Sequence, residues 1–194
     1  MRRSIVVIAC TCAAAALVGR ASISATGAGT SPALTTVAIT PTLVIGGTTY
    51  VAAGGTVDAF NTITGHLKWS QSTCDGSVAT PLAIAGGRVW VGDAGGEVEG
   101  INVLTGRIDG CQDIGYSYFS GLTAANGVVY AGNSGGQLVA ISATTMSVLW
   151  SVYLGSKNLQ TPSYAGGYLY VASASGLVYK VNPVSGKVVL VMHT

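Results

Sequence analysis

The chain has 194 residues and a formal net charge of +2; it is 49% hydrophobic, 8% charged and contains 28 glycines. Soluble domains carry about 25% charged residues on average, and disordered chains combine low hydrophobicity with high charge, so this composition excludes a disordered protein. Three of the nine basic residues, Arg2, Arg3 and Arg20, lie in the first 20 positions, which leaves six basic against seven acidic residues in the remainder. No basic patch remains there, and we therefore expect no nucleic-acid partner.

The first 28 residues have the organisation of an export signal. Arg2 and Arg3 precede a small and apolar run over residues 4–18, and small residues follow at 21–28, where a signal peptidase would cut. The apolar run is short for a membrane span, which needs roughly 20 residues. We therefore predict a signal peptide at 1–28, an exported mature protein (extracellular, or in the periplasm and cell envelope) and no transmembrane span after cleavage.

Two alternatives remain for this segment. It is retained as an N-terminal anchor, or the protein is a lipoprotein attached through Cys10, which follows Val7-Ile8-Ala9. The apolar stretch before Cys10 is shorter than a normal signal core, which favours the plain signal peptide. Residues 29–39 then form a short linker or strand.

From residue 40 onwards the chain repeats itself with a step of 40 residues. An aromatic residue recurs at this step, and so does the glycine-containing turn before it. The aromatic positions are Tyr50, Trp90, Tyr130 and Tyr170, and the turns are Gly46-Gly47, Gly86-Gly87, Asn126-Gly127 and Gly166-Gly167. A fixed period over four copies indicates a repeat architecture. The units cover about 40–73, 80–113, 120–155 and 161–194.

Each unit consists of four short runs separated by three turns. In the first unit the runs are 42–45, 48–53, 56–60 and 66–69. Such runs are typical of an antiparallel meander, and four strands in about 40 residues make a propeller blade. We therefore predict an all-β fold, a β-propeller of four four-stranded antiparallel blades, with a β-sandwich of hairpins as the alternative.

Four blades are at the lower limit for closing a ring. The last predicted strand, at 187–192, ends almost at Thr194, so we expect either a tight four-bladed ring or an open, incomplete propeller. An open propeller leaves the apolar faces of its first and last blades uncovered. We expect such faces to bind a protein partner or a second copy of the chain.

The third turn of each unit resembles the tryptophan-docking motif of the PQQ-like (quinoprotein-type) β-propeller repeat family, Ala-x-Asp-x-x-Thr-Gly-x-x-x-Trp. The best match is residues 59–69, with Asn61, Thr64-Gly65 and Trp69. The other copies contain Asn102 with Thr105-Gly106, Ser142 with Trp150, and Asn182 with Ser185-Gly186. The resemblance implies that Trp69, Trp150, Gly65, Gly106 and Gly186 dock each blade on its neighbour.

The resemblance does not extend to a catalytic site. The quinoprotein dehydrogenases of this family use an adjacent-cysteine disulfide, a calcium ion and a catalytic aspartate, and no adjacent cysteine pair or calcium ligand set can be matched here. His66 and His193 have no second His or Cys at metal-ligand spacing. We expect no catalytic residues and no cofactor. Pyrroloquinoline quinone (PQQ) with calcium is implied only if the chain is a fragment or relative of a PQQ-dependent dehydrogenase.

Six of the seven acidic residues lie between positions 75 and 113. Glu97 and Glu99 are two positions apart on a predicted strand and so point to the same face. Hard cations such as Ca²⁺ prefer carboxylate oxygens, but two carboxylates alone make a poor site. We interpret this face as the solvated outer face of the second blade and keep a metal site as a hypothesis.

After removal of the signal peptide, two cysteines remain, Cys74 and Cys111. An even pair in an exported protein indicates a disulfide. Both lie near the crossing from one blade to the next, so we predict a bridge between the first two blades that stabilises the fold by about 3–4 kcal/mol. The alternative is two separate thiols.

These features predict a secreted, non-catalytic, protein-binding scaffold, similar to the propeller scaffolds of bacterial envelope assembly factors. A fragment or relative of a PQQ-dependent quinoprotein dehydrogenase and a degraded remnant without function are the alternatives.

Overall fold

The computed structural model describes residues 42–78, 81–115 and 119–193. The predicted signal peptide at 1–28, with Cys10, and the linker at 29–39 lie outside the described residues. Within the described ranges the chain forms strands joined by turns and bends, without helix. The all-β prediction is confirmed.

The described residues form sixteen strands in four sheets, each made of four consecutive antiparallel strands. Blade 1 consists of β1 (Leu43–Ile45), β2 (Thr48–Ala53), β3 (Thr56–Asn61) and β4 (Leu67–Ser72). Blade 2 consists of β5 (Ala83–Ala85), β6 (Arg88–Gly92), β7 (Glu97–Asn102) and β8 (Ile108–Asp113). Blade 3 consists of β9 (Phe119–Ala125), β10 (Val128–Asn133), β11 (Gln137–Ser142) and β12 (Val148–Tyr153). Blade 4 consists of β13 (Ser163–Ala165), β14 (Tyr168–Ala172), β15 (Leu177–Val181) and β16 (Val188–His193).

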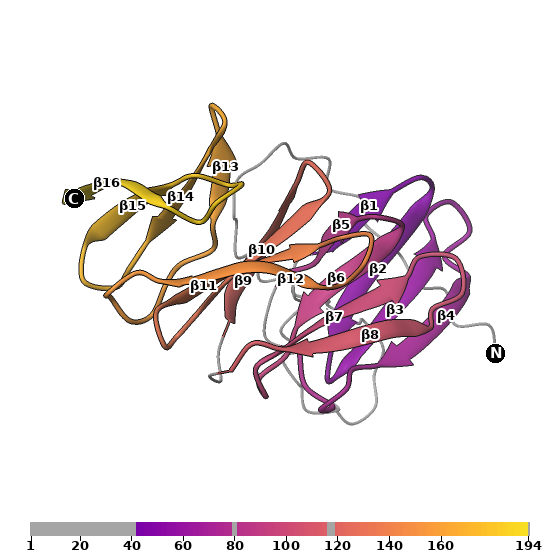
Figure 1. Cartoon of the computed structure of the whole chain (residues 1–194). Coiled ribbons are helices and arrows are strands. Elements are labelled where there is room, and N and C mark those ends of the chain that lie inside the picture. The colour runs from indigo at the N-terminus through magenta and orange to yellow at the C-terminus, as the bar shows by residue number, and fades with distance from the viewer. Residues whose placement is uncertain (1–41, 79–80, 116–118, 194) are drawn as a thin grey trace, which may run out of the picture.

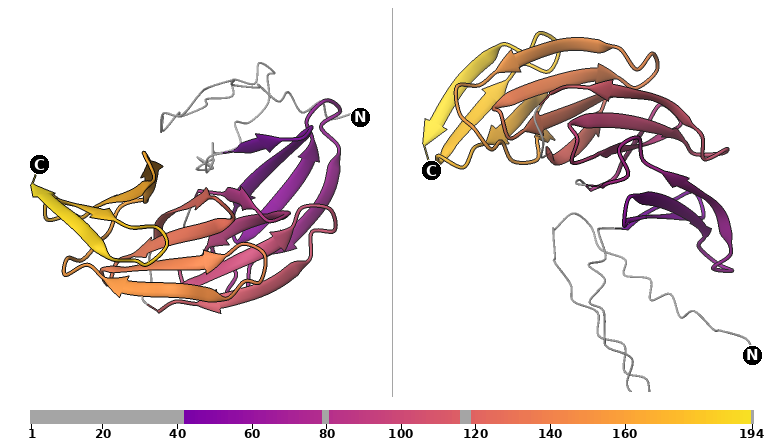
Figure 2. Two further views of the ribbon diagram at one scale, coloured as in Figure 1. Left: turned by 45° about the horizontal axis from the view of Figure 1, so that its top comes forward. Right: turned by 90° about the horizontal axis from the view of Figure 1, so that it is seen from below.

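The four blades follow one another in an arc (Figure 1). Figure 2 shows blades 1 and 4 at the two ends of this arc, well apart from each other. The described part of the chain is therefore an open propeller of four blades. Of the two forms expected from the sequence, the open propeller is confirmed and the tight four-bladed ring is not.

Asparagine side chains close the third turn of three of the blades, and Ser142 accepts a hydrogen bond of 3.1 Å from the Thr145 N–H in the other. In blade 1 the Asn61 Oδ1 atom accepts hydrogen bonds of 2.9 Å from the backbone N–H groups of Ile63 and Thr64. Asn102 and Asn182 make the same pair of bonds in blades 2 and 4. Asparagine stabilises turns in this way, so these side chains help to build the third turn.

Three apolar cores lie between successive blades, because side chains alternate between the two faces of each strand. Tyr50 and Ala52 of blade 1 face blade 2, where they share a core with Val89 and Val91. Trp90, between these two valines, belongs to the core between blades 2 and 3. Each blade thus has an incoming face toward the preceding blade and an outgoing face toward the following one. Among the described residues, no blade covers the incoming face of blade 1 or the outgoing face of blade 4.

Candidate functional site

Blade 1 docks on blade 2 through a tryptophan and a glycine. Trp69 lies on β4 opposite Ala59, and its indole N–H donates a hydrogen bond of 3.1 Å to the carbonyl of Val103, in the third turn of blade 2. Gly106 of the same turn lies against the indole, and a Cβ atom there would come within 2.6 Å of Trp69 Cγ. Glycine is therefore required where the indole rests. We call a third turn in this role a docking socket.

Blade 3 docks on blade 4 in the same way. Trp150 lies opposite Ala140 and donates a hydrogen bond of 2.9 Å to the carbonyl of Pro183. A Cβ atom on Gly186 would come within 2.7 Å of Trp150 Cε3. The structure therefore places both tryptophans, and two of the three glycines that the resemblance singled out, at blade contacts.

Blade 2 docks on blade 3 with the roles reversed. Gly100 and Gly110 are paired at the positions that hold alanine and tryptophan in blades 1 and 3, and Met146 from the third turn of blade 3 lies against them. A Cβ atom on Gly100 would come within 2.8 Å of Met146 Cε, and one on Gly110 within 3.3 Å. Sequence reasoning missed Met146. The sequence did contain a signal for this contact. Position 146 has methionine where the other third turns have glycine, and position 110 of blade 2 has glycine where blades 1 and 3 have tryptophan.

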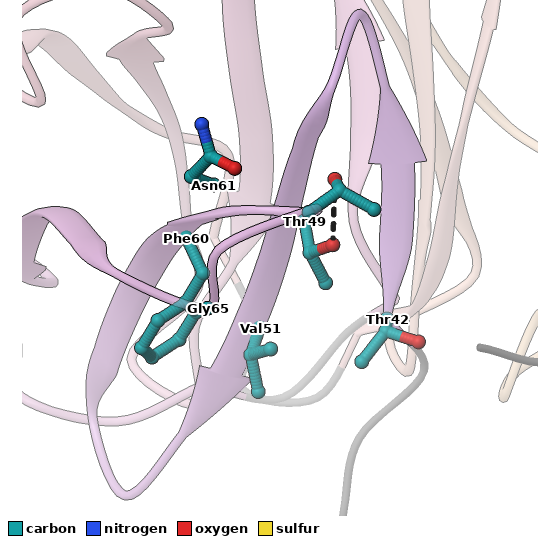
Figure 3. A pocket seen from close by; sticks show the side chains of 7 residues that line it. Thr42, Thr49, Val51, Phe60, Asn61 and Gly65 are labelled. Atoms are coloured by element: carbon teal, nitrogen blue, oxygen red, sulfur yellow. Dashed lines mark hydrogen bonds between the residues drawn. The ribbon is translucent and has the colours of Figure 1, made fainter. Parts of the chain in front are cut away.

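The docking socket of blade 1 receives no side chain among the described residues. Gly65 corresponds to Gly106 and Gly186, yet beyond its chain neighbours no heavy atom lies within 4 Å of the place where its Cβ would be. A cavity of about 190 Å³ lies there instead (Figure 3). Its lining consists of Thr42, Thr49, Val51, Phe60, Asn61, Thr62 and Gly65. We call this cavity the open socket.

The outgoing face of blade 4 presents the other half of a docking pair. Lys180 and Leu190 are paired across β15 and β16, in the register that Ala140 and Trp150 occupy in blade 3. Leu190, at the tryptophan position, is 49% exposed. The Lys180 ammonium lies 3.9 Å from the centre of the Tyr168 ring. A charged residue thus occupies the position that is alanine or glycine in blades 1 to 3.

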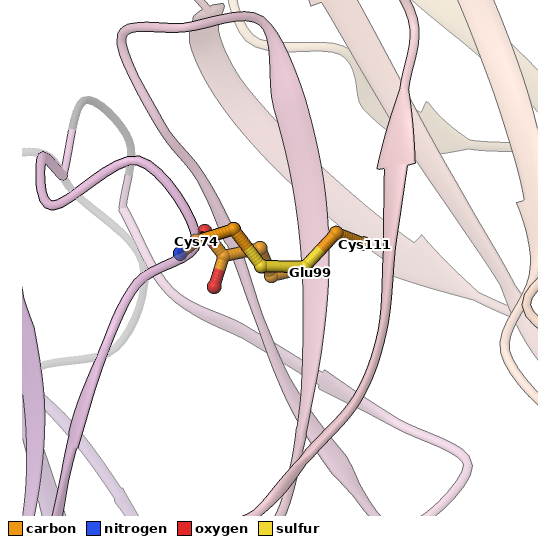
Figure 4. Close-up of side chains that lie close together, drawn as sticks. All are labelled: Cys74, Glu99 and Cys111. Atoms are coloured by element: carbon orange, nitrogen blue, oxygen red, sulfur yellow. A yellow bond between two sulfur atoms is a disulfide. The ribbon is translucent and has the colours of Figure 1, made fainter.

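A disulfide joins the first two blades (Figure 4). Cys74 follows β4 and is bonded to Cys111 on β8, at a sequence separation of 37 residues. The predicted pairing is confirmed. Glu99, which is paired with Cys111 across β7 and β8, lies beside the bridge.

Glu97 and Glu99 meet a third carboxylate, that of Asp93. One oxygen from each of these three side chains lies within 4.8 Å of the others, and we call the group the acidic pocket. Glu99 and Asp93 are 0% exposed, so the interpretation of this face as a solvated outer face is wrong. Glu99 lies on the incoming face of blade 2, where the Cys74 segment covers it.

Backbone N–H groups hold one oxygen of each buried carboxylate. Glu99 Oε1 accepts a hydrogen bond of 2.8 Å from Cys74, and Asp93 Oδ1 accepts bonds of 3.0 and 2.8 Å from Gly96 and Glu97. The other oxygens, Glu99 Oε2 and Asp93 Oδ2, are buried without a hydrogen-bond partner. The pocket therefore concentrates negative charge and leaves two acceptors unsatisfied.

The pKa values follow from this arrangement. Burial raises the pKa of Glu99 to about 7, although the Cys74 N–H lowers it, and the charge of Asp93 raises it further. Burial also raises the pKa of Glu97, and so do the charges of Asp93, Asp113 and Asp75. Both glutamates are therefore harder to ionise than free side chains.

Among the described residues, two groups of side chains are close enough to share a metal ion. They are the acidic pocket and the set Cys74, Glu99 and Cys111, whose two sulfurs are bonded to each other. Neither group includes His66 or His193. The described ranges also contain no helix of the length and apolarity that a membrane crossing requires.

Comparisons with known proteins agree with this architecture. Two solved structures are similar in fold: BamB from Moraxella catarrhalis (TM-score 0.67, 20% identity, 80% of this chain and 50% of that chain) and the computationally designed Ika8 protein (TM-score 0.74, 18% identity, 81% of this chain and 49% of that chain). This chain thus spans about half the length of each. No curated protein matches it. A protein-family model described as outer membrane protein assembly factor BamB matches residues 16–109 and 113–190.

Because this match extends over most of the sequence and the blades have the propeller fold, the chain belongs to the PQQ-like propeller family described as outer membrane protein assembly factor BamB.

Proposed function

We propose that this protein is an exported, non-catalytic scaffold that binds a partner protein through the uncovered faces at the two ends of its arc. The observation that carries the proposal is the open socket. Its turn has the same asparagine and glycine positions as the sockets that receive Trp69 and Trp150. A preformed apolar cavity of this kind suits a large apolar side chain of a binding partner.

Export is supported by two findings besides the signal-like start of the chain. The family is described as an outer membrane assembly factor, and the Cys74–Cys111 disulfide is typical of oxidising compartments outside the cytosol. Mass spectrometry of the mature protein from the native host tests this part. We expect an N-terminus near position 28, whereas a chain that begins at Met1 would contradict cleavage.

The partner that the two ends favour is a second copy of this chain. Leu190 on the outgoing face offers an apolar side chain to the open socket, and the charges of the two faces are opposite. Asp58 is paired with Val51 of the open socket and so lies on the incoming face, while Lys180 lies on the outgoing face. Head-to-tail contacts at both ends would close a ring of eight blades, within the range of known propellers.

The length of similar structures supports the same arrangement. This chain covers 50% of the BamB structure and 49% of the Ika8 structure, so two copies together have about the length of either. A symmetric pair would repeat one interface twice, and each interface would have the geometry of the contacts between blades within the chain.

Sedimentation of the mature, oxidised chain tests the pairing. We expect a dimer that dissociates when Lys180→Asp or Asp58→Lys reverses one charge, and that forms again when both changes are combined. Leu104→Asp is the control, because Leu104 is 86% exposed on blade 2 and lies away from both end faces. A monomer at every concentration, or charge variants that sediment like the wild type, would overturn self-association.

A photoreactive amino acid at Val51 tests the wider scaffold proposal in cells. We expect a discrete cross-linked product from the open socket and none from the same probe at Leu104. Products of the mass of two chains identify a second copy, and a product of other mass identifies a different protein. Equal labelling from both positions would argue against a docking role for the socket.

The non-catalytic part of the proposal has its own assay. We expect that incubation with PQQ and Ca²⁺ yields no bound cofactor absorbance and no dye reduction with alcohol substrates. Cofactor-dependent dye reduction would favour the dehydrogenase alternative.

A further inference from the structure

We propose that the acidic pocket of Asp93, Glu97 and Glu99 is a binding site for a divalent cation, with Ca²⁺ as the ion that fits best. The three carboxylates place one oxygen each within 4.8 Å of the others. Calcium binds oxygens at about 2.3–2.6 Å, so oxygens on opposite sides of one ion lie at about this separation.

The unsatisfied oxygens are the observation that points to a ligand. Asp93 Oδ2 and Glu99 Oε2 belong to side chains with 0% exposure, and neither has a hydrogen-bond partner. Buried polar atoms in folded proteins are almost always paired, and leaving a charged one unpaired is strongly unfavourable. A bound cation satisfies both oxygens at once and neutralises the repulsion between them.

The rest of the pocket holds these oxygens in place. Asp93 is fixed by the backbone N–H groups of Gly96, in the turn between β6 and β7, and of Glu97, the first residue of β7. Glu99 is fixed by the N–H of Cys74. The disulfide ties Cys74 to the neighbouring strand, so the segment that follows blade 1 is held over the site. The three carboxylates themselves all belong to blade 2.

Protein cations do not neutralise the pocket in the described part of the chain. The ion pair found there, between Arg88 and Asp109 at 2.7 Å, involves Arg88 at the start of β6, opposite Asn102 at the end of β7. Glu97 stands at the other end of β7, opposite Asp113. The length of β7 therefore separates Arg88 from Glu97.

The ligand chemistry selects calcium among common ions. The three ligands are carboxylates, and no histidine or free thiol is among them, which disfavours zinc and copper. Magnesium gives up its waters reluctantly and demands near-ideal octahedral geometry, which disfavours it at a site with two buried carboxylates. Calcium accepts irregular shells that water completes.

Thermal unfolding and terbium luminescence together test the site. We expect the melting temperature of the wild-type chain to rise by several degrees in millimolar Ca²⁺ relative to EDTA, because ligand binding to the folded state stabilises it. Terbium, which replaces Ca²⁺, should emit when bound, and Ca²⁺ should displace it. Asp93→Asn and Glu99→Gln should each abolish both responses.

Asp109→Asn is the matched control, because it removes a carboxylate of the same blade outside the pocket, and it should keep both responses. Identical melting of the wild type in Ca²⁺ and EDTA overturns the site, and this measurement does not depend on any variant folding. Responses that persist in Asp93→Asn and Glu99→Gln overturn it as well.

Discussion

Trp69 of blade 1 and Gly106 of blade 2 are packed so closely that a single methyl group at position 106 would come within 2.6 Å of the indole ring. The indole N–H also reaches the carbonyl of Val103 in the same turn. Gly65 has the same backbone conformation as Gly106, with φ of +68°, but faces the open socket. This pair of glycines separates the effect of backbone conformation from that of blade packing.

Gly106→Ala should destabilise the protein more than Gly65→Ala. Both changes place a Cβ atom in a left-handed conformation, which costs about 1–2 kcal/mol. Only the change at position 106 also forces Trp69 away, which adds roughly 1–3 kcal/mol. Urea unfolding of the two variants measures the difference. Equal losses would show that the indole does not need this glycine.

Trp69→Ala should lower the free energy of unfolding by about 3 kcal/mol or more, because it removes a packed aromatic side chain. Leu190→Ala, at the equivalent register of blade 4, should lower it by less than about 1 kcal/mol, because its side chain is half exposed. Both are measured under conditions where the chain is monomeric. A large loss from Leu190→Ala would contradict the uncovered outgoing face of blade 4.

Reduction of the Cys74–Cys111 disulfide should lower the free energy of unfolding by about 3–4 kcal/mol, because the bridge closes a loop between two blades. Melting with and without dithiothreitol measures the effect, and the double variant Cys74→Ala, Cys111→Ala is the control that should not respond. An unchanged wild-type melting temperature in the reductant, with the thiols shown to be free, would contradict a stabilising bridge. Reduction should also weaken any Ca²⁺ response, because Cys74 positions Glu99.

In EDTA, Glu99 should make the protein less stable as the pH rises. The pKa of Glu99 is about 7 in the folded protein, against an ordinary value of 4.5, so between these values the folded state retains a proton that the unfolded state has lost. The free energy of unfolding therefore falls by up to about 3 kcal/mol between pH 4.5 and pH 7 because of this group. Above pH 7 this contribution does not change further. Chemical denaturation of the wild type and of Glu99→Gln at pH 5 and pH 8 measures this.

The variant should be more stable than the wild type at pH 8, and the difference should shrink at pH 5. Other carboxylates titrate in both proteins, so only the difference between them reports on Glu99. A difference that is the same at both pH values would contradict the burial of an ionisable Glu99.

The prediction of the blades succeeded because the features that build them are local. Asn61 accepts hydrogen bonds from residues two and three positions further on, and the hairpins need glycine at their turns; such contacts are visible within a few residues. The pairing of Cys74 with Cys111 was also predictable, because the repeat places Cys74 just after the last strand of blade 1 and Cys111 near the end of the last strand of blade 2.

The acidic pocket was only half visible in the sequence. The spacing of Glu97 and Glu99 put their side chains on one face, but Asp93 joins them from the preceding turn. Whether that face is wet or buried depends on the Cys74 segment that covers it. Met146 was missed for the same reason, since its partners, Gly100 and Gly110, belong to another blade.

The amino-acid sequence by itself determined the four-stranded blade, its repetition and the positions of Trp69 and Trp150, because turns and strand alternation depend on near neighbours. Only the tertiary structure decided which sockets are filled and which carboxylates are buried. Trp69 and the carbonyl that it contacts are 34 residues apart, and burial at such a contact is a property of two surfaces that meet. The socket beside Gly65 is open because no described residue places a side chain there, as Trp69 does at Gly106. The residues around Gly65 in the sequence do not reveal this.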